Sequence, residues 1–151
     1  MTMTRLDILD RSVEKTHVWL NDLAEELGTD DPRYAYRVLR AFLHAVRDHL
    51  SVDEAAQLAA QLPIFVRGVF YEGWDPSGTP ERARDVDSFL RRIVGEALLA
   101  GETEASLAAT AAARAIATPL IIRERSGCGY SARLRSRISE PTATRNGRSV
   151  F

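Results

Sequence analysis

The sequence lacks several features that mark particular classes of protein. It has one cysteine in 151 residues, Cys128, which cannot form an internal disulfide and so fits a reducing compartment. Its first twelve residues contain no apolar run typical of a secretory signal peptide. The weakly polar stretch over 107–122 is interrupted by Arg114 and Pro119 and is too short to span a bilayer. These absences predict a soluble, cytoplasmic protein.

The chain also lacks an overall charge of one sign, because its net charge is only −1. This balance hides two unlike segments. Residues 1–122 carry 13 basic and 19 acidic side chains, a net of −6, whereas residues 123–151 carry 7 and 2, a net of +5. Hydrophobic residues make up 45% of the chain and charged residues 27%, which is typical of one globular domain. We therefore predict a domain over 1–122 and a basic tail of low order over 123–151.

Apolar side chains at helical spacing predict a first helix that ends at Gly28. A second helix is predicted to begin at Pro32, capped by Asp30 or Asp31. The expected core stripe of the first helix is Leu6, Leu9, Val13, Thr16, Leu20, Leu23 and Leu27. On the second helix, Ala35, Val38, Leu39, Phe42, Val46 and Leu50 are expected in the core, and Arg33, Arg37, Arg40, Arg47 and Asp48 largely toward solvent.

Three further helices are predicted along the chain. Ser51 and Glu54 form a capping box before a short helix that runs to Pro63. An aromatic-rich segment, predicted as a short helix or strand, leads into a turn region over 71–80. Helical periodicity returns over 85–99 and, in an alanine-rich form, over 102–118. Short loops between amphipathic helices favour antiparallel neighbours in an all-α bundle.

A shift of the chain by 70 residues aligns its apolar pattern with itself, without a gap. We therefore predict two related helical halves, over about 5–70 and 81–120, of which the second is truncated. The aligned pairs include Trp19 with Phe89, Leu20 with Leu90, Leu23 with Ile93, Ala24 with Val94, Ala35 with Ala105, Val46 with Ile116 and Leu50 with Leu120.

The pattern stops near residue 120, and the tail that follows is rich in Arg, Ser and Gly. Two interpretations remain open. The tail is either a basic arm for an acidic partner, or the product of a shifted reading frame in a GC-rich gene. The use of 19 arginines against one lysine is consistent with high GC content.

Four strings in order carry a family resemblance: HVWLNDLAEELG, LHAVRDHLS, AAQLP and IFVRGVFYEGWDP. Together they resemble domain-of-unknown-function family 2267, well over residues 5–100 and loosely over 101–120. The resemblance implies a small all-helical domain of two similar halves in bacterial cytoplasmic proteins, and it implies no activity. Beyond residue 120 the chain departs from the family, whose members resume with a second capping box and a short helix.

No residue pattern predicts a metal, a cofactor or a catalytic centre. Glu14 and His17 have the spacing used in di-iron carboxylate bundles, but a second such pair is missing, so a solvated helical pair is expected. His44 and His49 are five residues apart and cannot share a metal on one helix face. Cys128 has no base beside it and is expected to be a free thiol.

The sequence favours a non-enzymatic protein-interaction or stress-associated domain, which acts through a protein partner or by self-association. The alanine-rich helix over 103–118 is expected to leave apolar surface for such an association. One alternative is a small-molecule site or an enzyme that uses the aromatic and acidic loop, and another is nucleic-acid binding through the basic tail. The aromatic side chains Phe65, Phe70, Tyr71 and Trp74 are expected to close the end of the bundle, and the alternative is a recognition surface. The candidate binding surface consists of Phe70, Tyr71, Glu72, Trp74 and Asp75.

Overall fold

A computed structural model describes residues 7–80 and 85–124, and within these ranges the regular elements are all helical. This confirms the predicted all-α fold. The elements are α1 (Asp7–Leu27), α2 (Pro32–His49), α3 (Val52–Gln61), α4 (Ile64–Tyr71), the 3-10 turn η1 (Pro76–Gly78), α5 (Val86–Ala97) and α6 (Glu102–Glu124). Among the described residues, no helix is long and apolar enough to cross a membrane.

The chain divides into two units by its internal contacts, residues 1–116 and 117–151. Of the second unit, the structure describes only the last turns of α6. The predicted end of this helix at residue 118 is wrong, because α6 continues through Pro119 to Glu124. Proline disfavours a helix interior but does not forbid it. The basic tail from residue 125 onward, with Cys128, lies outside the described residues.

The turn from α1 to α2 follows the predicted signals. Gly28 takes a left-handed conformation with φ of 64°, and the N–H of Thr29 donates to the carbonyl of Ala24 at 3.0 Å. This hydrogen bond is the long one of a Schellman ending. Asp31, rather than Asp30, caps α2, since its side chain accepts from the Arg33 N–H, and Pro32 occupies the first helical position.

The capping box at the start of α3 is confirmed. The Ser51 hydroxyl accepts from the Glu54 N–H, and the Glu54 carboxylate accepts from the Ser51 N–H at 3.0 Å. Of the two forms predicted for the aromatic-rich segment, the structure shows a helix, α4. Neither end of this eight-residue helix has a side-chain cap from its own flanking residues. At the C-terminal end the Glu72 N–H donates to the carbonyl of Val69 at 3.2 Å.

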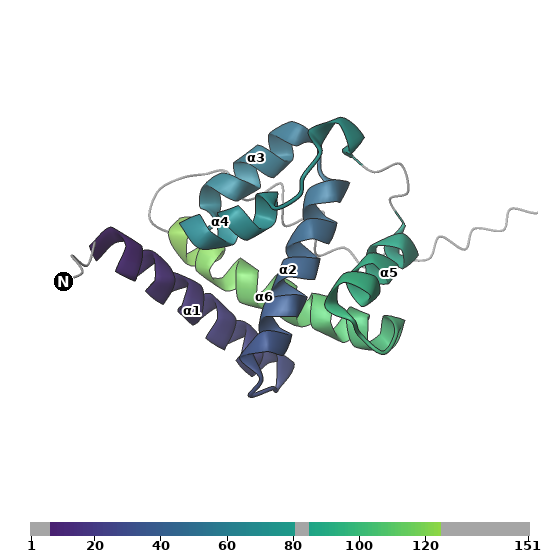
Figure 1. Ribbon diagram of the computed structural model, residues 1–151, viewed down its shortest axis with the longest axis horizontal. Helices are drawn as coiled ribbons and strands as arrows, with labels where there is room; N and C mark the ends of the chain where they lie inside the picture. The colour runs from purple at the N-terminus through teal and green to yellow at the C-terminus, as the bar shows by residue number, and fades with distance from the viewer. Residues whose placement is uncertain (1–6, 81–84, 125–151) are drawn as a thin grey trace, which may run out of the picture. The chain divides into compact units, whose positions relative to one another are not determined.

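Helix α2 is the centre of the first unit and packs against α1, α4 and α5 (Figure 1). Its core face includes Ala35, Val38, Leu39, Phe42 and Leu43, all buried. The expectation that the alanine-rich helix leaves apolar surface uncovered is wrong for most of its alanines, because the helix packs with them inward. The buried residues of α6 in this unit are Ala105, Ala108, Ala111, Ala112, Ala115 and Ile116.

Several structural features recur 70 residues apart. Helix α1 ends at Leu27 and α5 at Ala97, and α2 begins at Pro32 and α6 at Glu102. After α5 the chain turns left-handed at Leu98, with φ of 57°, where Gly28 stands after α1. The next hydrogen bond also matches, because the N–H of Leu99 donates to the carbonyl of Val94 at 3.1 Å. The two helix pairs therefore use the same turn.

Candidate functional site

The five residues of the predicted binding surface lie at the end of α4 and in the turn after it. One of them is in the core, and the other four are at least partly exposed. Phe70 is fully buried, so it belongs to the core and not to a surface. Tyr71 and Trp74 are half-buried and stack on each other, with ring centroids 5.2 Å apart. Glu72 and Asp75 are exposed. The four residues of the turn thus remain together, with Phe70 packed beneath them.

Both carboxylates of this turn accept hydrogen bonds from other residues of the chain. The Arg40 guanidinium donates to the Glu72 carboxylate at 2.8 Å and holds the pKa of Glu72 below its ordinary value. The hydroxyl and the N–H of Ser77 donate to Asp75 and lower its pKa in the same way. The indole N–H of Trp74, by contrast, is buried and has no hydrogen-bond partner among the described residues.

A buried polar cluster lies where α2 meets the end of α4 and one face of α5. Its central residue is Arg47, only 3% exposed. The guanidinium donates to the carbonyls of Phe70 and Glu72 at 2.8 and 2.9 Å, and to both carboxylate oxygens of Asp48. Arg92 of α5 forms an ion pair with Asp48 from the other side. The expectation that Arg47 and Asp48 face solvent is therefore wrong.

His44 occupies the same interface one turn earlier on α2 and is 4% exposed. Its Nδ1 lies 2.5 Å from the Glu96 carboxylate of α5, and its Nε2 lies 2.7 Å from the carbonyl of Val69 in α4. The same Glu96 oxygen accepts from Arg40 at 2.6 Å. His44 thus bridges three helices through both ring nitrogens.

The sequence analysis does not predict this cluster, because helical periodicity places each charged residue of α2 relative to that helix alone. A buried charge needs partners, and here they come from carbonyls at the end of α4 and from Arg92 and Glu96 on α5. One signal was available in the sequence. His44, Arg47 and Asp48 lie three or four residues apart, so they share one helix face beside the core stripe.

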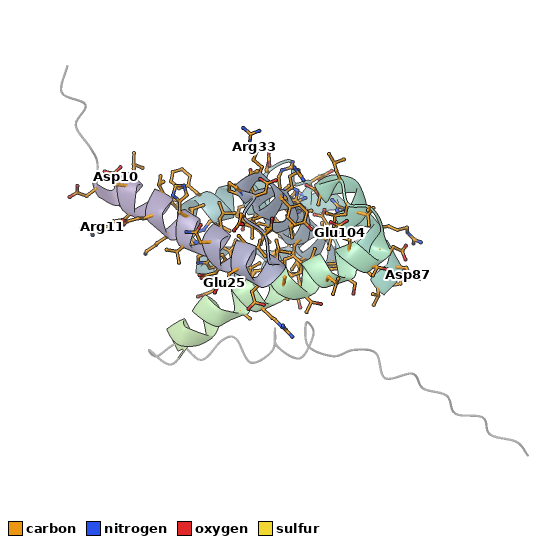
Figure 2. The ribbon with its side chains drawn as sticks, turned by 90° about the horizontal axis from the view of Figure 1, so that it is seen from below. Asp10, Arg11, Glu25, Arg33, Asp87 and Glu104 are labelled. Carbon is orange, nitrogen blue, oxygen red and sulfur yellow. The ribbon has the colours of Figure 1, made fainter. Side chains whose placement is uncertain are left out.

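The first two turns of α1 differ from the rest of that helix. The predicted core stripe is buried at Leu23, but Val13 is 41% exposed and Leu9 is 51% exposed. The expectation of a core role for these two residues is therefore wrong. Asp10 and Arg11 also point outward from these turns (Figure 2). Ile8 adds a further exposed apolar side chain.

Glu14 and His17 lie on the polar side of the same turns, and both are exposed, as expected of a solvated helical pair. An open concavity here is lined by Asp7, Asp10, Arg11, Val13, Glu14 and His17, all from α1. A depression lined by one helix is a surface feature and not an enclosed site. Among the described residues no group of three His, Cys, Asp or Glu side chains could hold a metal ion.

Comparison with protein families identifies the chain over most of its length. The model of a family described as an uncharacterized conserved protein, DUF2267, matches residues 16–128, which is more than half of the chain. The chain belongs to the DUF2267 family. A comparison with curated proteins gives no match.

The limits of the DUF2267 match differ from those of the sequence resemblance. The match begins at Thr16, not near residue 5, and it extends to residue 128, beyond the expected departure near 120. Its start has a structural counterpart, because α5 begins at Val86, 70 residues after Thr16. Residues 7–15 of α1 therefore lie outside the matched region. These are the same turns that expose Leu9 and Val13.

Proposed function

We propose that this DUF2267 protein is a non-enzymatic, cytoplasmic protein-interaction domain that binds a partner through residues 7–15 of α1. The observation that carries the proposal is the exposure of Leu9 and Val13. These residues continue the stripe that is buried further along the same helix, at Leu23. An apolar stripe that runs out of a core into solvent is typical of a surface that another helix covers.

The charge of the first unit indicates the chemistry of the partner. Residues 1–116 carry 19 acidic and 13 basic side chains, a net of −6. The negative charge of this unit favours a basic partner. We therefore expect an amphipathic helix whose apolar side chains cover Leu9 and Val13 and whose flanks are basic.

The state of the polar groups supports a non-enzymatic role. The charged groups at the α2, α4 and α5 interface are bonded to one another or to helix carbonyls, as Arg47 and His44 show. Groups used in this way stabilise the fold and are not free to act on a substrate. The proposal therefore assigns the buried cluster to structure and the exposed turns of α1 to function.

A synthetic amphipathic peptide of leucine and lysine tests the proposal on the full chain. We expect it to bind, and to shift the amide resonances of residues 7–15. The variant Val13→Asp is expected to lose this binding, whereas Val18→Asp, on another exposed face of α1, is expected to keep it. Both variants add the same charge, so a purely electrostatic contact would strengthen in both. Equal or stronger binding by Val13→Asp would overturn the proposal.

A second candidate function is the binding of a small polar molecule at the turn after α4. The Trp74 N–H is buried, meets no hydrogen-bond partner in the described part of the chain and lies beside the stacked Tyr71 ring, which favours this candidate. Such a ligand would accept a hydrogen bond from the indole and lie against the aromatic pair. A Trp19→Phe variant leaves Trp74 as the single tryptophan, so its fluorescence would report binding from a panel of metabolites. No quenching and no rise in melting temperature would exclude this candidate.

We also infer that the two halves arose by duplication of one helical unit. The matching turns at Gly28 and Leu98 support this, as do the matching ion pairs. Glu26 lies 3.9 Å from Arg114, and the residues 70 positions away, Glu96 and His44, are also paired. Residues 7–15 lie outside the matched region, which is consistent with a binding role that other members of the family need not share.

A further inference from the structure

We propose that the partner of residues 7–15 is an amphipathic helix that is basic along one flank only, the flank that lies against Asp10 and Glu14. This inference rests on the proposed function, and it narrows the basic flanks expected there to one. Its basis is the unequal chemistry of the two sides of the exposed stripe, formed by Leu9 and Val13, which are 51% and 41% exposed. The difference between the sides determines both the composition and the direction of the bound helix.

One side of the stripe is acidic. With 3.6 residues per helical turn, Asp10, Glu14 and Asp7 lie roughly 80°, 120° and 140° around α1 from the midline of the stripe. All three side chains are exposed. The open concavity of α1 is lined by these carboxylates and by Val13, so the acidic surface adjoins the apolar stripe directly. Among residues 7–80 and 85–124, no cation forms an ion pair with any of the three.

The other side of the stripe has a different chemistry. Ser12, Ile8 and Lys15 lie at the corresponding angles in the opposite sense. The Ser12 hydroxyl donates to the Ile8 carbonyl at 2.7 Å, and the Ile8 side chain is 73% exposed. Lys15 is also exposed. This side therefore offers a partner apolar surface and a positive charge.

A helix that lies along the stripe meets the two sides with its two flanks. Lysine or arginine on the first flank lies beside Asp10 and Glu14, where opposite charges attract. On the second flank a cation would be repelled by Lys15, whereas an uncharged or apolar side chain would cover Ile8. Charge complementarity therefore selects a helix with one basic and one uncharged flank over a helix that is basic on both.

The one-sided charge also sets the direction in which the partner binds. Turning a helix end for end over the same stripe exchanges its two flanks. A helix with a single basic flank therefore meets the acidic side in one direction only. A spin label at the N-terminus of a bound peptide reports this direction, because it broadens the amide resonances near it. Two peptides with lysine on opposite flanks are expected to bind in opposite directions, one label broadening residues near Asp7 and the other residues near Lys15. The same direction for both peptides would overturn the inference.

The affinities of three synthetic helical peptides for the full chain test the composition. All three have the same apolar face of leucine. The first has lysine on one flank and glutamine on the other, the second has lysine on both flanks, and the third has glutamine on both. At physiological ionic strength, which screens distant charges, we expect the first to bind about fivefold more tightly than the third and about as tightly as the second. Equal binding of the first and third, or a second gain as large from the second lysine flank, would overturn the inference.

Matched variants separate a local contact from the net charge of the protein. Asp10→Asn is expected to weaken binding of the first peptide by about threefold and to leave binding of the third unchanged. The control Glu25→Gln removes the same charge from an exposed residue at the other end of α1 (Figure 2). It is expected to change neither affinity. Equal losses for the first peptide in the two variants would overturn the inference.

The variant Val13→Asp distinguishes failure of this inference from failure of the proposed function. We expect it to abolish binding of all three peptides. If it leaves all three affinities unchanged, the stripe is not the binding surface, and both proposals are wrong. If it abolishes binding while peptides with lysine and glutamine flanks bind the wild type equally well, the stripe remains the binding surface and only the one-sided partner is excluded.

Discussion

The phenol of Tyr34 donates a 2.9 Å hydrogen bond to the carboxylate of Glu104, the residue 70 positions later in the chain. Each is the third residue of its helix, α2 and α6. Burial raises the pKa of Tyr34, and the bond to Glu104 raises it further. The Ala100 N–H and then the Tyr34 hydroxyl hold the pKa of Glu104 below its ordinary value. This bond joins the third residues of two helices whose starts are 70 residues apart.

The substitution Tyr34→Phe is expected to lower the melting temperature by a few degrees, because it removes the donor and leaves the ring in place. The companion Glu104→Gln weakens the same bond from the other side. The double variant is expected to be less destabilised than the sum of the two single variants, since both act on one interaction. Calorimetry of the four proteins measures this coupling, and strict additivity would contradict it.

The left-handed residues at the two equivalent turns predict opposite effects of glycine. Leu98 adopts φ of 57° with its side chain 78% exposed, so it has strain and little packing to offset it. Leu98→Gly is expected to stabilise the protein by about 1 kcal/mol. Gly28→Ala is expected to destabilise it by about 1 kcal/mol, although an added Cβ would meet no atom within 4 Å. Urea unfolding measures both, and a destabilising Leu98→Gly would contradict the strain.

Arg47 is expected to be the charged residue of α2 on which stability depends most. Arg47→Met removes the donors to Phe70 and Glu72 and one partner of buried Asp48, with an expected loss of about 3 kcal/mol. The control Arg33→Met changes a side chain that points outward from the start of the same helix (Figure 2). Its effect is expected to stay within about 0.5 kcal/mol. Similar losses in both variants would contradict a structural role for the cluster.

Acid is expected to destabilise the protein through carboxylates whose pKa is lowered in the fold. The hydrogen bond from Arg40 lowers the pKa of Glu72, and the hydrogen bond from the Ser88 N–H lowers the pKa of Asp85. For such groups the stabilisation is present above the ordinary pKa and is lost as the pH falls through the folded value. The melting temperature is therefore expected to fall as the pH drops below about 4.5, the ordinary pKa of Glu. A constant value between pH 6 and pH 3 would contradict these interactions.

Local signals predicted most of the helical framework. The structure has a helix end at each of three predicted signals, Gly28, Pro32 and the Ser51 capping box. These residues act on the backbone beside them, so their effect can be predicted from the sequence. Periodicity likewise identified Leu23 and Ile93 as core residues of α1 and α5. These features depend on residues that are neighbours in the chain.

The candidate site was less predictable because it depends on contacts between distant segments. Periodicity assigned Leu9 to the core and Arg47 to solvent, whereas the structure reverses both. The stripe of α1 is longer than the surface available to cover it, and Arg47 is buried because helix carbonyls from α4 need donors. Neither the extent of the covering helices nor the end of α4 over α2 can be read from the pattern of one helix.

The proposed interaction is tested most directly by a photo-crosslinking amino acid placed at Val13 in cells that make this protein. We expect an adduct with a basic protein partner from Val13 and none from the control position Val18, which is also exposed on α1. The absence of an adduct at Val13, the same adduct from both positions, or an adduct with a second copy of this chain would contradict the account.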